Sequence, residues 1–218
     1  MIILIKKNRW FLLPYLVSIV TVLYFILNYS KATIHLFLNS FNNSFADIFF
    51  KNITYLGDGL FIPAFIIIML FIRFRHAFFV TFVYAVSGLF TQLLKRTLFT
   101  DVVRPTKYLD GIAELHLVPG VEQLCCKSFP SGHSTTAFGI MICFAIVLQN
   151  RYLKLCSFIL AALIAYSRVY LSQHYLIDIF VGSLIGVITG LISYKLIEPL
   201  KWRWLDKSLL SFSKKQIG

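Results

Sequence analysis

The residues best suited to chemistry are a histidine and an aspartate four positions apart, His174 and Asp178. On a helix this spacing places the carboxylate one turn from the imidazole on the same face, where it can hold one ring nitrogen protonated and leave the other free. An imidazole held in this way can act as a nucleophile. A second histidine, His133, lies elsewhere in the chain and can protonate a leaving oxygen as a general acid.

Three cations and the start of an apolar stretch suit the binding of a phosphate. Lys95, Arg104 and Arg168 supply fixed positive charge and several N–H donors for a tetrahedral dianion. Ser131 and Gly132 immediately precede an apolar segment, so their backbone N–H groups can point at an anion along the expected helix axis. A single Lys or Arg at the end of a membrane span is about as often an anchor, so the set as a whole favours a phosphate site.

The remaining candidate ligands do not suggest a metal. No carboxylate cluster and no His and Cys set has the spacing of metal ligands, so we expect a metal-free mechanism without a cofactor. His35, His76 and His116 have no acidic residue or cysteine at ligand spacing and are expected to be interface or loop residues. Asp58 lies between two glycines and is expected to cap a helix rather than to line a cavity.

The composition excludes a water-soluble globular domain. Of 218 residues, 58% are hydrophobic and 14% are charged, with a mean hydropathy of +0.78. The apolar residues form blocks of about 20 residues, the length needed to cross a bilayer. The formal charge of +12 arises from basic residues between these blocks. Because they form no stripe on a soluble face, we expect membrane lipids and not nucleic acid as partners. The sequence therefore predicts one integral membrane domain over residues 1–218.

The apolar blocks predict an all-α bundle of six membrane-spanning helices. The expected spans are Trp10–Asn28, Gly59–Ile72, Ala77–Leu94, His133–Leu148, Leu153–Tyr170 and Tyr175–Leu196. Twelve basic residues lie in one set of connections, and eight lie in the other set with most of the acidic residues. Basic connections face the cytoplasm. Both termini are then cytoplasmic, and the candidate site residues meet at the opposite face.

Two connections on that outer side have features of their own. Between Ile34 and Phe49, apolar residues recur at three- and four-residue steps among polar ones, which predicts an amphipathic helix along the interface or over the bundle. The stretch from Thr106 to Lys127 is long for a loop in a compact bundle. It is either a substrate-selecting lid or an inert excursion of the surface.

The candidate residues resemble the motifs of the type 2 phosphatidic acid phosphatase (PAP2) superfamily, a family of membrane phosphatases. The central motif stands unbroken as Pro130-Ser131-Gly132-His133. The third motif has the spacing of the family, with Ser167-Arg168 followed by His174 and Asp178. The resemblance extends from about residue 92 to the end of the sixth expected span, at about residue 196, and implies the six-helix core of that family.

The first motif departs from the family pattern. It is usually a lysine, six residues and then Arg-Pro, whereas Lys95 precedes Arg104-Pro105 by eight residues and Thr97 occupies the usual lysine position. The connection must bulge for the Lys95 ammonium group to reach the phosphate bound by Arg104. Arg96 is the alternative to Lys95.

The resemblance implies a reaction in two steps. His174 would attack phosphorus to give a phosphohistidine, His133 would protonate the departing group, and water would then release phosphate. Asp178 would orient His174. The phosphoryl oxygens would be held by five residues, Lys95, Arg104, Ser131, Gly132 and Arg168.

We therefore expect a membrane lipid phosphatase that hydrolyses a phosphomonoester or terminal diphosphate at the outer, periplasmic or extracytoplasmic face. Resemblance to bacterial members suggests undecaprenyl diphosphate, phosphatidylglycerophosphate, phosphatidic acid or lipid A phosphate, with undecaprenyl diphosphate as the first choice. One alternative is a phosphotransferase that passes the phosphoryl group to a second lipid. A non-enzymatic lipid-phosphate transporter is disfavoured, because binding alone needs the cations but not the pairing of His174 with Asp178.

Overall fold

The computed structural model describes residues 2–59 and 61–213, and these residues form helices and no β-strand. The α-helices are α1 (Ile2–Lys7), α2 (Arg9–Asn28), α3 (Lys31–Asn39), α4 (Ser44–Ile53), α5 (Ile62–Ile72), α6 (Phe74–Thr97), α7 (Pro105–Leu109), α8 (Gly132–Val147), α9 (Arg151–Tyr170), α10 (Leu176–Ile197) and α11 (Leu209–Ser213). Two short 3₁₀ turns, η1 (Thr54–Gly57) and η2 (Arg203–Asp206), complete the order.

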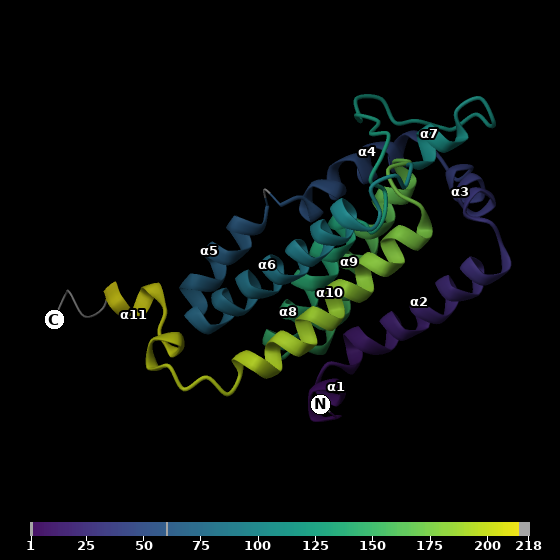
Figure 1. Cartoon of the computed structure of the whole chain (residues 1–218). Coiled ribbons are helices and arrows are strands. Elements are labelled where there is room, and N and C mark those ends of the chain that lie inside the picture. Colours follow the sequence, from purple (N-terminus) through teal and green to yellow (C-terminus); the bar gives the residue numbers. More distant parts are fainter. Residues whose placement is uncertain (1, 60, 214–218) are drawn as a thin grey trace.

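Helix α8 lies at the centre of the bundle. It packs against α10, α9 and α6, while α2 covers α9 and α5 covers α6. In Figure 1 the long helices run side by side, with α4 and α7 at one end of the bundle and α1 and α11 toward the other. The starts of α8 and α10, which carry the central and third motifs, lie at the end with α4 and α7.

Four described helices are long and apolar enough to cross a membrane, namely α2, α6, α9 and α10. The expected second span, Gly59–Ile72, corresponds to α5, which has only 11 residues and is bent by 58° from the preceding α4 and η1. An 11-residue helix is about 16 Å long, roughly half of a hydrocarbon core. A fifth crossing is obtained if the bent pair is counted as one span. Helix α8 is apolar but has 16 residues, so a count of six spans remains a prediction.

The stretch expected to form one amphipathic helix contains two. Helix α3 ends at Asn39 and α4 begins at Ser44. The break is stabilised by asparagines, since the Asn43 side chain accepts a hydrogen bond from the Ala46 N–H and caps α4. An Asx cap of this kind competes with continuation of the helix. The apolar periodicity therefore identified the helical residues but not the interruption.

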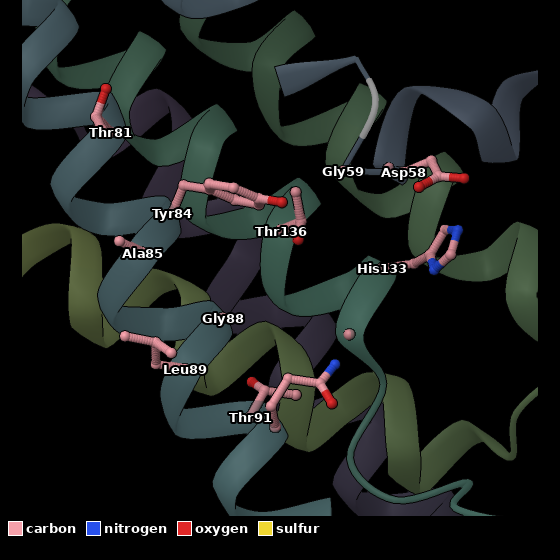
Figure 2. A pocket seen from close by; sticks show the side chains of 13 residues that line it. Asp58, Gly59, Thr81, Tyr84, Ala85, Gly88, Leu89, Thr91, His133 and Thr136 are labelled. Carbon is pink, nitrogen blue, oxygen red and sulfur yellow. The ribbon is translucent and has the colours of Figure 1, made fainter. Parts of the chain in front are cut away.

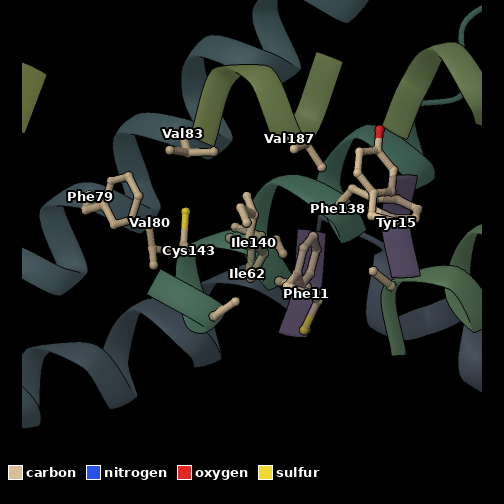
Figure 3. Close-up of a cluster of buried hydrophobic side chains, with 14 of the residues drawn as sticks. Phe11, Tyr15, Ile62, Phe79, Val80, Val83, Phe138, Ile140, Cys143 and Val187 are labelled. Atoms are coloured by element: carbon tan, nitrogen blue, oxygen red, sulfur yellow. The ribbon is translucent and has the colours of Figure 1, made fainter. Parts of the chain in front are cut away.

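The buried core lies between α2, α6, α8 and α10 (Figure 3). Phe11 and Tyr15 of α2 contact the bundle, and the ring centroid of Tyr15 is 5.2 Å from that of Phe138 on α8. The Tyr15 hydroxyl also forms a hydrogen bond of 3.1 Å with Ser183 Oγ on α10. This bond satisfies a polar group that would be costly to bury without a partner.

Glycines bring α8 and α10 unusually close. A Cβ atom built on Gly182 would lie 2.5 Å from the Ser131 carbonyl oxygen, and one on Gly186 would lie 2.5 Å from that of Thr135. Small residues at a helix interface allow two backbones to approach in this way. Along α10 the partners advance in the same direction along α8, from Ser131 for Gly182 to Thr135 for Gly186 and Ile142 for Gly190. The two helices are therefore parallel, and their N-terminal ends meet.

Candidate active site

The first turns of α8 and α10 are joined by a backbone hydrogen bond, in which Ser131 N–H donates to the Asp178 carbonyl oxygen at 3.0 Å. Ser131 caps α8, since its Oγ accepts a hydrogen bond from the Ser134 N–H. The central and third motifs, separated by more than 30 residues in the sequence, thus form one surface. A Cβ at Gly132 would meet no protein atom within 4 Å, so the start of α8 is open to a ligand.

His174 and Asp178 lie as their spacing predicts. His174 Nδ1 is 3.4 Å from Asp178 Oδ2, and both side chains are buried. The same carboxylate oxygen accepts hydrogen bonds from Ser128 Oγ and from the Tyr175 N–H. Ser128 Oγ is also 3.4 Å from His174 Nδ1. Asp178 is therefore fixed by two donors while it holds the Nδ1 side of the imidazole.

Arg104 lies on the other side of the imidazole. Its Nη1 is 3.5 Å from His174 Nε2 and donates to the Gln173 carbonyl oxygen at 2.8 Å. Its Nε donates to the Cys126 carbonyl oxygen at 3.0 Å. The guanidinium group is thereby fixed beside Nε2, the nitrogen that Asp178 leaves free. An anion attacked by Nε2 would contact Arg104.

Arg168 occupies the last turn of α9 and is buried. Its Nη1 donates to Thr54 Oγ1 at 2.9 Å, whereas its Nε is buried without a partner among the described residues. The Arg168 carbonyl oxygen accepts the N–H groups of Gln173 and His174, which places the cation at the turn that carries His174. A buried donor of this kind is costly to leave unpaired. A phosphoryl oxygen would satisfy it.

Lys95 and Arg96 point in different directions at the end of α6. Lys95 is 9% exposed, while Arg96 is exposed. Lys95 interacts electrostatically with Arg104, Arg168 and Asp178. The inward side chain is therefore Lys95, despite the two additional residues in the first motif.

His133 lies where two cavities meet. The first, of about 350 Å³, is lined by Thr54, Arg168 and Gln173 together with residues 120–122 and Leu124, and is called the catalytic cavity. The second, of about 540 Å³, lies between the η1–α5 connection, α6 and the start of α8, and is called the lateral cavity. His133 and Asp58 line both cavities. In Figure 2 their side chains project from the same side of the lateral cavity, opposite α6.

The pKa of His174 is set by its surroundings. Burial lowers it well below the usual value of 6.5, and the cations of Arg104, Lys95 and Arg168 lower it further. Burial also lowers the pKa of Arg104, although the Asp178 carboxylate opposes this shift. A neutral imidazole carries the lone pair that a nucleophile needs. The surroundings of His174 therefore favour its neutral form at neutral pH.

Four residues that the sequence analysis did not select complete the site. Ser128 contacts Asp178 and His174, Gln173 contacts Arg104, and Thr54 contacts Arg168. Asp58 was expected to cap a helix; it is the C-cap residue of η1 and also lines both cavities, and its side chain forms no capping bond among the described residues. For Gln173 and Ser128 the sequence signal was proximity, since Gln173 precedes His174 and Ser128 precedes the central motif. Thr54 and Asp58 had no such signal.

The long outer loop forms part of the site wall. His116 Nε2 is 2.9 Å from Asp47 Oδ1 on α4, and Lys51 Nζ donates to the Pro119 carbonyl oxygen at 2.6 Å. Gln173 Nε2 donates to the Glu122 carbonyl oxygen at 3.0 Å. These bonds hold residues 116–122 over the catalytic cavity. In the described ranges, no group of three or more His, Cys, Asp or Glu side chains is arranged to hold a metal ion.

A helical bundle with apolar spans and a histidine, aspartate and arginine site at one end defines a class of multi-pass membrane protein with an anion site. A model of the PAP2 superfamily matches residues 76–202. The chain belongs to this superfamily, which confirms the resemblance drawn from the three motifs.

Its relatives include two curated lipid A 4'-phosphatases. That of Porphyromonas gingivalis is 31% identical over 80 residues, which cover 37% of this chain and 34% of the relative. That of Bacteroides thetaiotaomicron is 27% identical over 77% of each chain. The chain thus matches about a third of the first relative and three quarters of the second. Among solved structures, LpxE of Aquifex aeolicus is 27% identical with a TM-score of 0.69, over 77% of this chain and 97% of that one.

Proposed function

We propose that the protein is a metal-independent lipid phosphatase that acts through a phosphohistidine at the outer face of the membrane. The observation that carries this proposal is the asymmetric environment of His174. Its Nδ1 is 3.4 Å from Asp178 Oδ2, while its Nε2 is 3.5 Å from Arg104 Nη1. A nucleophile needs this combination of an orienting acceptor on one nitrogen and an anion site at the other.

The proposed reaction has two steps. In the first, His174 Nε2 forms a bond to phosphorus, the bond from phosphorus to the leaving oxygen breaks, and His133 donates a proton to that oxygen. In the second, water forms a bond to phosphorus as the bond from Nε2 breaks, with His133 accepting the proton of the water. Lys95, Arg104, Arg168 and the N–H groups at the start of α8 hold the equatorial oxygens, which carry the developing charge.

A lipid substrate follows from the location of the site. The catalytic residues lie at the ends of membrane-spanning helices, level with the headgroups, where the tail of a lipid stays in hydrocarbon. The basic connections at the opposite end support an orientation with both termini in the cytoplasm and the site outside. The whole chain, residues 1–218, acts as one domain in this proposal. The relatives support a lipid A phosphate, one of the alternatives from the sequence, as the substrate. Undecaprenyl diphosphate, the first choice, rests on the sequence alone.

The test is release of inorganic phosphate by purified protein from a panel of lipid phosphates, with a chelator and no divalent metal present. We expect turnover, loss of turnover in His174→Ala, and no loss in His76→Ala, a matched variant at the far end of α6. Labelled substrate should leave an acid-labile, base-stable phosphate on the denatured protein. Full activity of His174→Ala would remove the nucleophile, and inhibition by chelator would contradict metal independence.

A phosphotransferase would share the first step. The two activities are separated by adding a second lipid with a free hydroxyl group to the assay. Hydrolysis predicts that free phosphate accounts for all the phosphate lost from the substrate. Transfer predicts that the label appears in the second lipid.

A further inference from the structure

The lateral cavity opens onto the outside of the bundle. Its α6 wall is formed by one helical face, on which Thr81, Ala85, Gly88 and Gln92 recur at three- and four-residue steps. Thr81, Ala85 and Gln92 are exposed, and a Cβ at Gly88 would meet no protein atom within 4 Å. Because α6 is a candidate membrane span, the open side of this cavity faces lipid.

The two cavities differ in their basic residues. The catalytic cavity is lined by two cations, Arg168 and Lys51, and by two acidic residues, Asp58 and Glu122. None of the described residues that line the lateral cavity is Lys or Arg, and its one acidic residue is Asp58. Its other polar side chains are the His133 imidazole and the neutral groups of Thr81, Tyr84, Thr91, Gln92 and Thr136. Arg104 and Arg168 thus lie at the phosphate position, while the space beyond His133 offers a carboxylate and no Lys or Arg.

The direction in which the leaving group departs from phosphorus assigns a role to the lateral cavity. In phosphoryl transfer the nucleophile and the leaving oxygen lie roughly in line, on opposite sides of phosphorus. His174 Nε2 lies beside Arg104, and His133, which protonates the leaving oxygen in the proposed reaction, borders both cavities. The leaving oxygen belongs to the alcohol part of the lipid, whose tail stays in the membrane. This alcohol therefore lies in the cavity that opens to lipid.

We infer that the lateral cavity binds the leaving alcohol and that Asp58 accepts a hydrogen bond from a hydroxyl or amide N–H of that alcohol. The substrate class is then a lipid phosphomonoester with hydrogen-bond donors beside its phosphate, such as a sugar or glycerol headgroup. This inference rests on the proposed function and makes Asp58 a specificity-determining residue. Figure 2 shows Asp58 beside His133, as the role requires.

A lipid diphosphate fits this cavity poorly. When its terminal phosphate is removed, the leaving group is a second phosphate, which carries negative charge of its own. That charge would lie near the Asp58 carboxylate, and the described lining holds no Lys or Arg to balance it, only the His133 proton that passes to the leaving oxygen. Like charges brought together away from bulk water are strongly unfavourable. The undecaprenyl diphosphate favoured from the sequence is therefore the poorer substrate in this inference.

The experiment compares two lipids in the full-length protein. Phosphate release is measured from phosphatidylglycerophosphate, whose leaving glycerol carries a hydroxyl group, and from a polyprenyl diphosphate. We expect wild type to favour the monoester in kcat/KM by at least about tenfold. Asp58→Ala should lower kcat/KM for the monoester by about 10- to 100-fold, as expected for loss of a bond to a charged acceptor. It should not lower kcat/KM for the diphosphate.

Two controls keep the test independent of folding. Glu114→Gln removes an exposed acidic group from the outer loop and should leave the ratio of the two kcat/KM values unchanged. Substrate in which the free hydroxyl of glycerol is replaced by hydrogen removes the same bond without altering the protein. Wild type should lose about as much on this analogue as Asp58→Ala loses on the parent lipid, and the two losses should not add.

The outcomes distinguish this inference from the proposed function. Phosphate release from no lipid would contradict the proposed function itself. Equal or better turnover of the diphosphate by wild type would overturn the inference and leave the phosphatase intact. An equal loss on both lipids in Asp58→Ala would also overturn it, because Asp58 would then serve the chemistry at His133 and not the choice of alcohol.

Discussion

Replacing Gly186 with alanine should separate α8 from α10 and impair the site without altering any residue that contacts substrate. The added Cβ would lie 2.5 Å from the Thr135 carbonyl oxygen and 2.7 Å from the Gly139 nitrogen. Real Cβ atoms essentially never approach closer than 3.0 Å, so one backbone must retreat by at least about 0.5 Å. Both obstacles are backbone atoms of a helix, which cannot turn aside as a side chain can.

The size of the effect follows from this displacement. Overpacking a well-packed interface costs about 1–3 kcal/mol. For a chain of this length, that cost lowers the midpoint of thermal unfolding by about 2–12 °C. The retreat also moves Ser131 and His133 relative to His174 and Asp178. Since a misplacement of about 1 Å can cost a hundredfold in rate, we expect kcat to fall by about 10- to 100-fold.

The assay pairs thermal unfolding in detergent with phosphate release. Gly88→Ala is the matched control, because its Cβ would meet nothing within 4 Å and alanine favours a helix by up to about 1 kcal/mol. Its unfolding midpoint should equal or exceed that of wild type. If Gly186→Ala unfolds and turns over like wild type, the close contact of α8 and α10 does not set the geometry of the site.

Three further predictions concern single side chains. Arg168→Ala should lower kcat/KM for phosphate release by about 100- to 1000-fold, as for loss of a donor to a developing oxyanion, and a loss below tenfold would contradict its contact with the phosphoryl group. Lys95→Ala should cost far more activity than Arg96→Ala, because Lys95 is buried beside Arg104 and Arg168 while Arg96 is exposed; the reverse order would mean that Arg96 fills the first motif. Burial lowers the pKa of His35 to about 4, so its neutral form contributes stability that is complete above pH 6.5 and is lost as the pH falls toward 4. Between pH 7.5 and pH 5, wild type should lose about 2 kcal/mol more unfolding free energy than His35→Asn, as measured by denaturant titration, and equal losses would show that His35 is not held neutral.

Hydropathy located several helices closely. The spans expected at His133–Leu148, Leu153–Tyr170 and Tyr175–Leu196 correspond to α8, α9 and α10 within two residues at each end. These ends carry local signals, such as the Ser131 cap before α8 and the Asn150 cap before α9. The bend before α5 and the break between α3 and α4 have weaker signals. Both depend on how short helices pack against α9 and α6, which an apolar run does not specify.

The candidate site shows the same difference between features with a local sequence signal and features that depend on packing. His174 and Asp178 were identifiable because a spacing of four residues has a fixed meaning on a helix. Thr54 and Arg168 are 114 positions apart, and Ser128 and Asp178 are 50 apart. No periodicity relates such positions, since their contacts arise only when the bundle closes. The sequence therefore indicated the reacting groups, while the groups that hold them required the structure.

The outer loop determines from which side a substrate reaches these groups. It is bonded to α4 through His116 and Asp47, to Lys51 through the Pro119 carbonyl oxygen, and to the turn before α10 through Gln173. A loop held at two places on α4 and at one place on the turn before α10 covers the catalytic cavity and is costly to displace. Among the described residues, the α6 wall of the lateral cavity has no such cover, since Ala85 is exposed and Gly88 has no side chain. In the proposed function the lipid reaches His133 from the membrane side, so the residues beside that opening, Asp58 above all, are the ones that we expect to select among lipids.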